Sequence, residues 1–479
     1  MKYDVIIIGA GLGGLTAGAK LAKEGKKVLV IEQHTKPGGC ATTFTRGDYT
    51  LEVGLHEMNG PSPSDMKSRV FSDLEVAGNV EFIKVPEFYH FTNGRRSLTI
   101  PHDPGTAIRV LENEFPGEID GIRAYFEQVL NPKRKQTGPE QEKEKSIGEF
   151  LDSIITDEDL KLVLLGNLGY FHDDPYSLSL TYYSVAQGSY YKGGGSFIRG
   201  GSQKLSDYLA NFIRGHGGEV LLNRLATGLV ADGRRLSGVT FRKKTGPASE
   251  TMTATADEII ANMSMPGLKE LLPEQEASVI TDAIHGQRPG ASLLTAYFGF
   301  KKPLRNLGFS YYSTFVFDSS VKSQSDILKN NRSSFEERSF TFVDYGQIDS
   351  GLAPEGKSVG AVCCIDYPGE WELLSKDAYR RKKEETAQIF IRRLEKLIPG
   401  ISEHIDYYEV GTPLTVKRYT LNPEGAVYGF AQVPSRPAVK YQGIFDNLHF
   451  ASAWGTLGGG FSGTILSGYL CAVGLLRKK

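Results

Sequence analysis

The stretch that decides the fold lies at the start of the chain and runs Tyr3-Asp4-Val5-Ile6-Ile7-Ile8-Gly9-Ala10-Gly11-Leu12-Gly13-Gly14. Residues 3–8 form a continuous apolar run, which is typical of a strand buried on both faces of a parallel sheet. A helix is predicted from Leu12 to Glu24, with Gly25 at its C-terminal cap. A second buried strand is predicted over Lys27–Glu32. The segment therefore predicts a βαβ unit.

The glycines of this unit have the GxGxxG spacing of a dinucleotide-binding turn. The first glycine permits a tight turn, the second lets the backbone approach a pyrophosphate, and the third lets helix and strand pack closely. The helix N-terminus then offers free N–H groups and a positive dipole end to the phosphates. Glu32 lies 23 residues after Gly9, where a carboxylate accepts hydrogen bonds from the adenosine ribose. The candidate residues are Gly9, Gly11, Leu12, Gly13, Gly14, Glu32 and Gln33. The alternative is a glycine-rich turn that binds nothing.

Length and composition limit the remaining possibilities. A chain of 479 residues predicts two or three packed units, and a formal charge of −1 gives no reason to expect a nucleic-acid partner. Four cysteines without a CxxC pair predict neither a disulfide framework nor a metal site, and they favour a reducing cytosol. The first strand leaves no room for a signal peptide, so we expect a cytoplasmic protein. The apolar stretch Gly455–Leu476 contains seven glycines, which argues against a membrane span.

The middle of the chain is less regular. Helix formers are frequent from Asp103 to Gln187, interrupted by a charged run over residues 131–145 that is either a solvated loop or a contact with anionic lipid. Residues 193–241 combine glycine turns, an amphipathic helix and short strands, and Ala256–Ala261 is another buried strand. Residues 293–342 and 359–366 alternate as the strands of an antiparallel sheet do.

The next motif indicates which dinucleotide binds. Pro37-Gly38-Gly39-Cys40 follows the second strand and continues through Ala41 to Glu52-Val53-Gly54-Leu55-His56. Here the sequence resembles the phytoene desaturase, carotenoid isomerase and retinol saturase superfamily of FAD-dependent oxidoreductases, and is most similar to its retinol saturase-like branch. The resemblance implies that FAD is lined by Gly38, Gly39, Cys40, Ala41, Gly54, Leu55 and His56.

Later segments extend the resemblance over nearly the whole chain. Gly193-Gly194-Gly195, Ile198, Gly200-Gly201-Ser202 and Leu205 are similar to the family's central loop, and the stretch from Gly217 to Ala226 is similar to the strand whose backbone meets the adenine. The glycine segment 455–463 is similar to the family's closing segment, with a helix expected to open at Thr464. It implies flavin contacts from Gly455, Gly459, Gly460, Phe461 and Thr464. No second GxGxxG follows a later strand, so no separate NAD(P)H domain is expected.

These motifs predict an α/β fold with a discontinuous, Rossmann-like FAD-binding domain of the glutathione-reductase-like type. Residues 1–75, 193–265 and 440–479 are expected to form it. Residues 76–192 and 266–439 are expected to form a substrate domain, with a mixed or antiparallel sheet and a helical cap over an apolar cavity.

Catalytic residues are harder to predict, because hydride exchange needs only a flavin held close to a substrate carbon. His56 and Glu57 are acid–base candidates, although a lone histidine is also common in structural roles. Trp454 either walls the flavin or packs in the core. Cys40 has no basic partner in sequence, which favours packing over a reactive thiol. Aromatic residues that either line a tunnel or pack cores are Tyr182, Tyr183, Tyr190, Tyr191, Tyr428, Phe430 and Phe461.

Three functions are compatible with the sequence. The first is a flavoenzyme that saturates, desaturates or isomerises double bonds of a hydrophobic polyene, with a peripheral membrane contact because such substrates dissolve in lipid. The second is an amine oxidase or porphyrinogen-type oxidase. The third is a non-enzymatic escort of prenylated proteins, which shares the architecture but has lost the flavin. The intact glycine motif and Glu32 argue against such a loss. The redox partner is left open.

Overall fold

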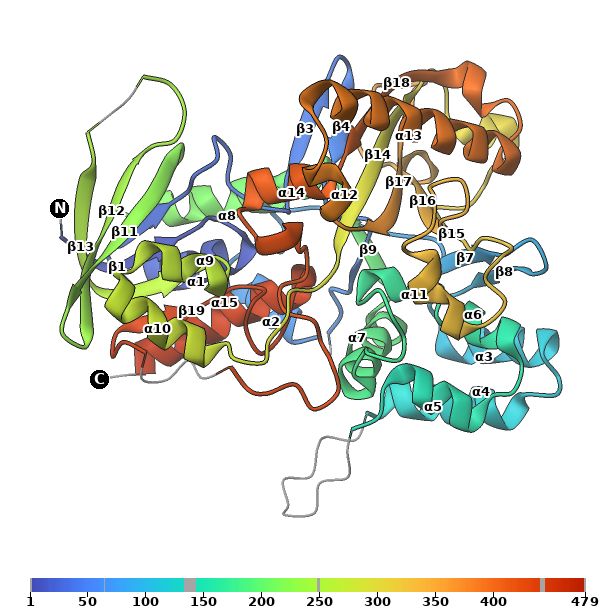
Figure 1. The fold of residues 1–479 in the computed structure, drawn as a ribbon, viewed down its shortest axis with the longest axis horizontal. Helices are drawn as coiled ribbons and strands as arrows, with labels where there is room; N and C mark the ends of the chain where they lie inside the picture. The colour runs from blue at the N-terminus through green and yellow to red at the C-terminus, as the bar shows by residue number, and fades with distance from the viewer. Residues whose placement is uncertain (1, 64, 133–143, 248–249, 440–443, 478–479) are drawn as a thin grey trace.

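The computed structural model describes residues 2–63, 65–132, 144–247, 250–439 and 444–477, and two large sheets organise it (Figure 1). The first sheet has seven strands in the order β10-β2-β1-β13-β12-β11, with β19 paired to β13. Its strands are β1 (Lys2–Ile8), β2 (Val28–Ile31), β10 (Glu219–Leu221), β11 (Arg224–Asp232), β12 (Arg235–Lys243), β13 (Met252–Ala261) and β19 (Leu448–Phe450).

The predicted βαβ unit is confirmed at the centre of this sheet. Strand β1 pairs in parallel with β2 on one side and β13 on the other, and its residues from Val5 to Ile8 are buried. Helix α1 (Leu12–Lys23) connects β1 to β2 and packs against α8 (Gln203–Gly215) and α15 (Gly460–Arg477). Parallel strands buried on both faces require the uninterrupted apolar runs seen in the sequence.

The second sheet has the order β18-β14-β17-β16-β15-β7-β8. Its strands are β7 (Tyr89–Thr92), β8 (Ser97–Ile100), β14 (Ser292–Phe300), β15 (Ser313–Val316), β16 (Phe340–Asp344), β17 (Ser358–Asp366) and β18 (Ile405–Gly411). All neighbours are antiparallel except β7 and β15, so the sheet is mixed. Helix α13 (Lys376–Leu397) packs along this sheet against β18.

The helical cap lies beside β7 and β8 (Figure 1). Its helices are α3 (Pro104–Glu114), α4 (Ile119–Leu130), α5 (Ile147–Ile154), α6 (Glu158–Leu164) and α7 (Leu180–Gly193). Each of α3, α5, α6 and α7 begins after an Asp or Ser whose side chain accepts a backbone N–H, as stable N-caps do. Apolar side chains from these helices share one core with β7 and β15.

Smaller elements connect these parts. Strands β3 (Thr43–Arg46) and β4 (Tyr49–Glu52) form a separate two-stranded hairpin, and β9 (Gly195–Ile198) pairs with both β5 (Met58–Asn59) and β6 (Phe82–Lys84). The short helices are α2 (Met66–Asp73), α9 (Met265–Leu268), α10 (Glu274–Ala283), α11 (Ile327–Asn330), α12 (Gly369–Glu372) and α14 (Pro413–Thr420).

Two sequence expectations differ from the structure. The final helix begins at Gly460 and not at Thr464, because the positive φ of Gly460, +75°, lets the chain turn directly into it. Helix α10 lies in the range expected for the substrate domain, but its buried residues pack on the first sheet. The strands of the two large sheets are otherwise compatible with the predicted domain division, which stays a prediction.

Two further expectations concern the membrane. Within the described ranges, the structure contains no helix with the length and apolar character that a membrane span requires. Most of the charged run over residues 131–145 lies outside the described residues.

Candidate active site

One large cavity of about 1710 Å³ is lined by both sheets and the cap. Ordinary ligand pockets measure about 300–1,000 Å³, so this volume has room for a dinucleotide and a second ligand together. Residues from both chain ends reach it, including Gly9 after β1 and Phe461 in α15, and so does Leu293 of β14. Segments distant in sequence therefore meet around a single space.

The glycine turn after β1 is held against the segment that follows β2. The amide of Gly38 donates to the carbonyl of Ala10 at 2.7 Å, and Gly11 forms a bridge with Gly38. Gly9 has a φ of +97°, and a side-chain carbon there would lie 2.5 Å from the carbonyl oxygen of Asn262. The turn requires glycine for both reasons.

Glu32 braces the same turn from the end of β2. One carboxylate oxygen accepts the amide of Ala10 and the other accepts the amide of His34, both at 2.7 Å. Burial raises the pKa of Glu32, although these amides and the positive charge of Lys244 oppose the shift. Its neighbour Gln33 is held by a bond to the Tyr419 carbonyl at 3.0 Å and by the Lys244 amine.

Two residues that sequence reasoning missed also hold the cavity wall. Asn262 follows β13 and donates to the Gly9 carbonyl at 3.0 Å. The sequence could have indicated Asn262 by its position directly after a buried strand, because ligands bind at the carboxyl edge of a parallel sheet. Glu52 accepts the Ser202 amide and hydroxyl, both at 2.7 Å, and the amides of Gly54 and Leu55. It thereby joins the Gly54 segment to the central glycine segment.

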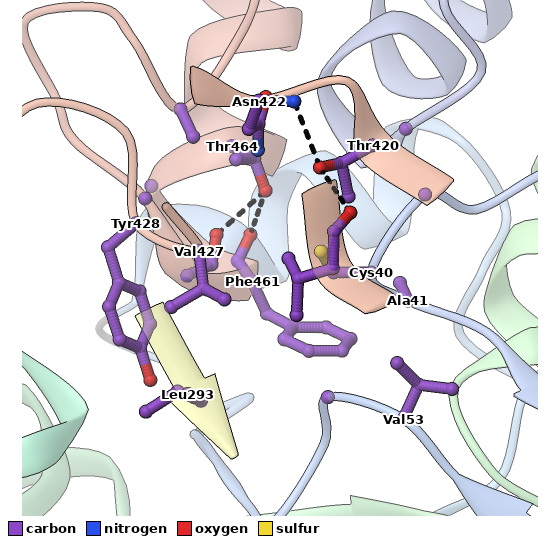
Figure 2. Close-up of a pocket in the computed structure, with 18 of the residues that line it drawn as sticks. Cys40, Ala41, Val53, Leu293, Thr420, Asn422, Val427, Tyr428, Phe461 and Thr464 are labelled. Carbon is purple, nitrogen blue, oxygen red and sulfur yellow. Dashed lines mark hydrogen bonds between the residues drawn. The ribbon is translucent and has the colours of Figure 1, made fainter. Parts of the chain in front are cut away.

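The C-terminal segment forms the opposite wall. The Thr464 hydroxyl donates to the Gly460 carbonyl at 2.7 Å within the first turn of α15. A side-chain carbon on Gly459 would lie 2.6 Å from the Tyr428 backbone, so glycine is needed for this close approach. Figure 2 shows the rings of Tyr428 and Phe461 facing the same space as Val53 and Leu293.

Most candidate cofactor residues line this one cavity. They are Gly9, Gly11, Leu12, Gly13, Glu32, Gln33, Gly38, Gly39, Cys40, Ala41, Gly54, His56, Ala226, Gly459, Gly460, Phe461 and Thr464. Three candidates are not in the lining. Gly14 packs α1 onto the turn, since a side-chain carbon there would lie 2.2 Å from the Gly9 carbonyl. Leu55 is fully buried in the core, and the Gly455 amide closes a turn onto Ser452.

His56 and Glu57 differ in their surroundings. The His56 ring lines the cavity, with Nδ1 3.2 Å from the Tyr170 hydroxyl, and burial lowers its pKa to about 4. Glu57 is buried, and neither carboxyl oxygen has a hydrogen-bond partner among the described residues. Desolvation, and then the charge of Glu87, raise the pKa of Glu57 well above its usual value. His102 Nε2 lies 3.8 Å from this carboxyl. His56 is therefore uncharged at neutral pH, whereas burial disfavours the ionised form of Glu57.

The aromatic candidates separate into two groups. Tyr182, Tyr190, Tyr428 and Phe461 line the cavity, whereas Tyr183, Tyr191 and Phe430 belong to cores.

Trp454 is among the residues that line the cavity, but it is only 2% exposed. Its indole N–H donates to Asn422 at 3.2 Å, and its ring packs edge-on against Phe430. Burial raises the pKa of the Cys40 thiol to about 11. Both placements favour the packing interpretation.

The residues present fit a flavin dinucleotide. Glycine backbone faces the cavity at Gly39, which lies beside Gly11 at the N-terminus of α1, and at Gly460, which begins α15. The described residues contain no cluster of side chains that could hold a metal ion.

The chain belongs to the family of flavin containing amine oxidoreductases, whose model matches residues 12–476. It is 27% identical over 471 residues to prolycopene isomerase 2 of an Oncidium hybrid cultivar, covering 89% of this chain and 75% of that protein. It is 24% identical over 490 residues to the all-trans-retinol 13,14-reductase of Danio rerio, covering 89% and 77%. These relatives match the carotenoid isomerase and retinol saturase superfamily predicted from the motifs.

Solved structures share the fold at low identity. An oxidoreductase from Methanosarcina mazei superposes with a TM-score of 0.70 at 15% identity over all of both chains. Cyclohexylamine oxidase from Brevibacterium oxydans superposes with a TM-score of 0.66 at 17% identity over 99% of each. The family match confirms that the chain is an FAD-dependent oxidoreductase, which disfavours the escort function.

Proposed function

We propose that this enzyme saturates, desaturates or isomerises carbon–carbon double bonds of a hydrophobic polyene. The observation that carries the proposal is the continuity of one cavity from the glycine-lined end to a wall of aromatic side chains. Tyr182, Tyr190, Tyr428 and Phe461 offer flat apolar surface for a conjugated chain. The relatives named as a prolycopene isomerase and a retinol reductase support the same substrate class.

The cofactor-binding roles follow from the placement of each segment. The amides around Gly11 and Gly39 would hold the pyrophosphate, Glu32 the ribose, and the backbone at Ala226 the adenine. The segments at Gly54 and Gly459–Thr464 would enclose the flavin ring. When bound, FAD supplies a ring nitrogen that takes up or releases hydride beside the substrate.

His56 and Glu57 are the proposed proton-handling groups. Burial raises the pKa of the Glu57 carboxyl, which favours its protonated form, and such a group can donate its proton to a substrate carbon, as the saturation of a double bond requires. The neutral His56 ring and the Tyr170 hydroxyl face the cavity next to it and would relay or orient that proton.

The cavity is poorly suited to a cationic amine, which would need an accessible carboxylate. Burial disfavours the ionised form of Glu57, and Glu409 forms an ion pair with Arg46 at 2.9 Å. Glu32 already accepts two backbone amides. These three carboxyl groups are therefore either engaged within the protein or disfavoured as anions, which favours an uncharged substrate over an amine.

A peripheral membrane contact is part of the proposal. Val185 and Leu457 both line the cavity, and they are 57% and 42% exposed to solvent, respectively. An apolar rim of this kind would let a lipid-dissolved substrate enter without crossing water. We expect the holoenzyme to co-sediment with liposomes, and Val185→Asp with Leu457→Asp to reduce sedimentation. Equal solubility with and without lipid would contradict this contact.

The test of the reaction uses chemically reduced holoenzyme without oxygen. We expect all-trans-retinol or a carotenoid to restore the oxidised flavin spectrum, or to emerge as a different geometric isomer if no net electron transfer occurs. Failure with every polyene, together with rapid peroxide production from a polyamine in air, would establish the amine oxidase alternative.

A further inference from the structure

The acid–base pair, His56 and Glu57, lies in a short stretch of chain without regular secondary structure. Residues 55–57 are part of the connection between β4 and β5, and they belong to neither strand. Leu55 and Glu57 are buried. A buried carbonyl that has no partner in a helix or a sheet costs free energy unless another group donates to it. The carbonyls of this stretch therefore need donors from elsewhere in the molecule.

Three tyrosine hydroxyls supply these donors, one for each successive carbonyl of residues 55–57. The bonds run from Tyr345 to Leu55 at 3.1 Å, from Tyr312 to His56 at 2.5 Å, and from Tyr190 to Glu57 at 3.4 Å. The bond from Tyr190 is the longest of the three and thus the weakest. Tyr312 and Tyr345 are fully buried, so water does not compete for their hydroxyls.

The three tyrosines come from parts of the chain that are distant from residues 55–57. Tyr345 begins a 3-10 helix directly after β16, Tyr312 directly precedes β15, and Tyr190 lies in α7 of the helical cap. The stretch itself belongs to the range expected for the FAD-binding domain. The second sheet and the cap therefore hold the acid–base pair in place, although the pair is far from both in sequence.

The Glu57 carboxyl group depends on this support of the backbone. Neither of its oxygens has a hydrogen-bond partner among the described residues, so no side-chain bond fixes its direction. His102 Nε2 lies 3.8 Å from Oε2, which is longer than a hydrogen bond. Oε2 packs instead against Gly195 of β9, where an added side-chain carbon would lie 1.9 Å from it. Packing and the position of the backbone are thus what place the carboxyl group.

We propose that Tyr312 and Tyr345 are positioning residues that hold the acid–base pair at the cavity surface for proton transfer. This inference rests on the proposed function. Proton transfer requires the donor within hydrogen-bond reach of the accepting atom, and a displacement of about 1 Å can lower the rate about 100-fold. Among the described residues that line the cavity, neither of the two tyrosines is present. They therefore act through residues 55–57 and not on the substrate.

The test compares Tyr312→Phe with the wild type, because this change removes only the hydroxyl. Reduced holoenzyme is mixed with all-trans-retinol without oxygen, and flavin reoxidation is followed over a range of retinol concentrations. The limiting rate should fall about 10- to 100-fold, since the proton donor is displaced, while the half-saturating concentration should stay unchanged. The double variant Tyr312→Phe/Tyr345→Phe should lose more. FAD content and melting temperature serve as the folding control.

Tyr89→Phe is the matched control. The Tyr89 hydroxyl is also buried and also donates to a backbone carbonyl, that of Val163 at 2.9 Å, but it lies in the core of the cap. The control should lower the melting temperature about as much as Tyr312→Phe and leave the limiting rate unchanged. Hydrogen exchange of a peptide that spans residues 55–57 gives a readout without substrate. Exchange should be faster in Tyr312→Phe than in the wild type and unchanged in Tyr89→Phe.

An unchanged limiting rate or unchanged hydrogen exchange in the double variant would overturn the inference. Equal losses of rate in Tyr89→Phe and Tyr312→Phe would overturn it too, because the effect would then follow stability alone. If the double variant does not retain FAD, the two single variants decide by the same criteria. Absence of flavin reoxidation by every polyene in the wild type would instead remove the proposed function, and hydrogen exchange would then decide whether the tyrosines hold this stretch.

Discussion

Glu32 and Glu52 are two buried carboxylates that are satisfied mainly by backbone amides. Glu32 holds the first glycine turn, whereas Glu52 ties the Gly54 segment to Ser202. Such bonds to a charged acceptor are stronger than neutral ones and fix loops that would otherwise move. The cavity wall therefore depends on two single side chains, Glu32 and Glu52, which are both buried.

Glu32→Gln should weaken FAD binding about 10- to 100-fold. The amide NH2 group of glutamine would face an N–H donor at Ala10 or His34, and one charge-assisted bond would be lost. The measurement is titration of apoprotein with FAD. The exposed residue Glu24 supplies the control, since Glu24→Gln should leave the affinity unchanged. Equal affinities in both variants would contradict the role given to Glu32.

Glu57→Gln should lower the rate of polyene turnover about 10²- to 10⁴-fold while FAD content and stability are kept. Glutamine matches the size of a protonated glutamic acid but cannot release a proton, so a purely structural Glu57 would tolerate the change. The rate is followed by reoxidation of reduced flavin. In the wild type this rate should fall at alkaline pH as Glu57 ionises, and that limb should be absent in Glu57→Gln. An unchanged rate would assign Glu57 to structure alone.

At the scale of elements, the crossing of α1 and α15 decides how the two chain ends meet. A side-chain carbon on Gly468 would lie 2.1 Å from the Gly13 carbonyl oxygen, and one on Gly13 would lie 1.8 Å from the Ala451 carbonyl. Glycine at position 468 therefore allows α15 to touch the backbone of α1, and glycine at position 13 allows α1 to approach the segment after β19. This contact brings the N-terminal turn and the closing segment to the same cavity (Figure 1).

Gly468→Ala should therefore destabilise the protein by about 1–3 kcal/mol and weaken FAD binding, because the added methyl group pushes α15 away from α1. The matched control is Gly474→Ala in the same helix, where an added side-chain carbon meets no atom within 4 Å. That variant should be stabilised by about 0.5–1 kcal/mol through helix propensity. Chemical unfolding and FAD titration measure both. Similar losses in the two variants would show that the crossing is not the cause.

At the scale of the whole molecule, burial creates a shared sensitivity to acid. His56, His90 and His102 lie in different segments around the second sheet, and desolvation lowers the pKa of each to about 4. In the unfolded chain a histidine titrates near 6.5, so between about pH 6.5 and 4 the unfolded state binds more protons than the folded state. Stability is then complete above this window and falls as the pH falls through it.

We expect the contribution of these histidines to the free energy of unfolding to decrease as the pH falls from about 6.5 to 4. His56→Asn should make this decrease shallower, since His56 alone contributes up to roughly 3 kcal/mol across the full window. His285→Asn, at an exposed position, should leave the slope unchanged. Urea unfolding at several pH values measures the effect. Parallel pH curves for the wild type and His56→Asn would contradict it.

The sequence by itself determined the parts of this protein that depend on local chain geometry. The apolar run of β1, the glycine turn, Glu32 at the end of β2 and the glycines before α15 each impose a backbone path on their own, and the resemblance they carry led to FAD. The high content of helix-forming residues also predicted the helical cap, but the sequence did not show which side chains form the core of that cap.

Only the tertiary structure decided which side chains face one another. The approach of Glu87 and His102 to Glu57 and the support of Gly9 by Asn262 both join segments that are distant in sequence. Tertiary packing also decides that Tyr182 lines the cavity while its neighbour Tyr183 is buried in a core. Burial and electrostatic shifts arise from such long-range neighbours, and no spacing along the chain encodes them.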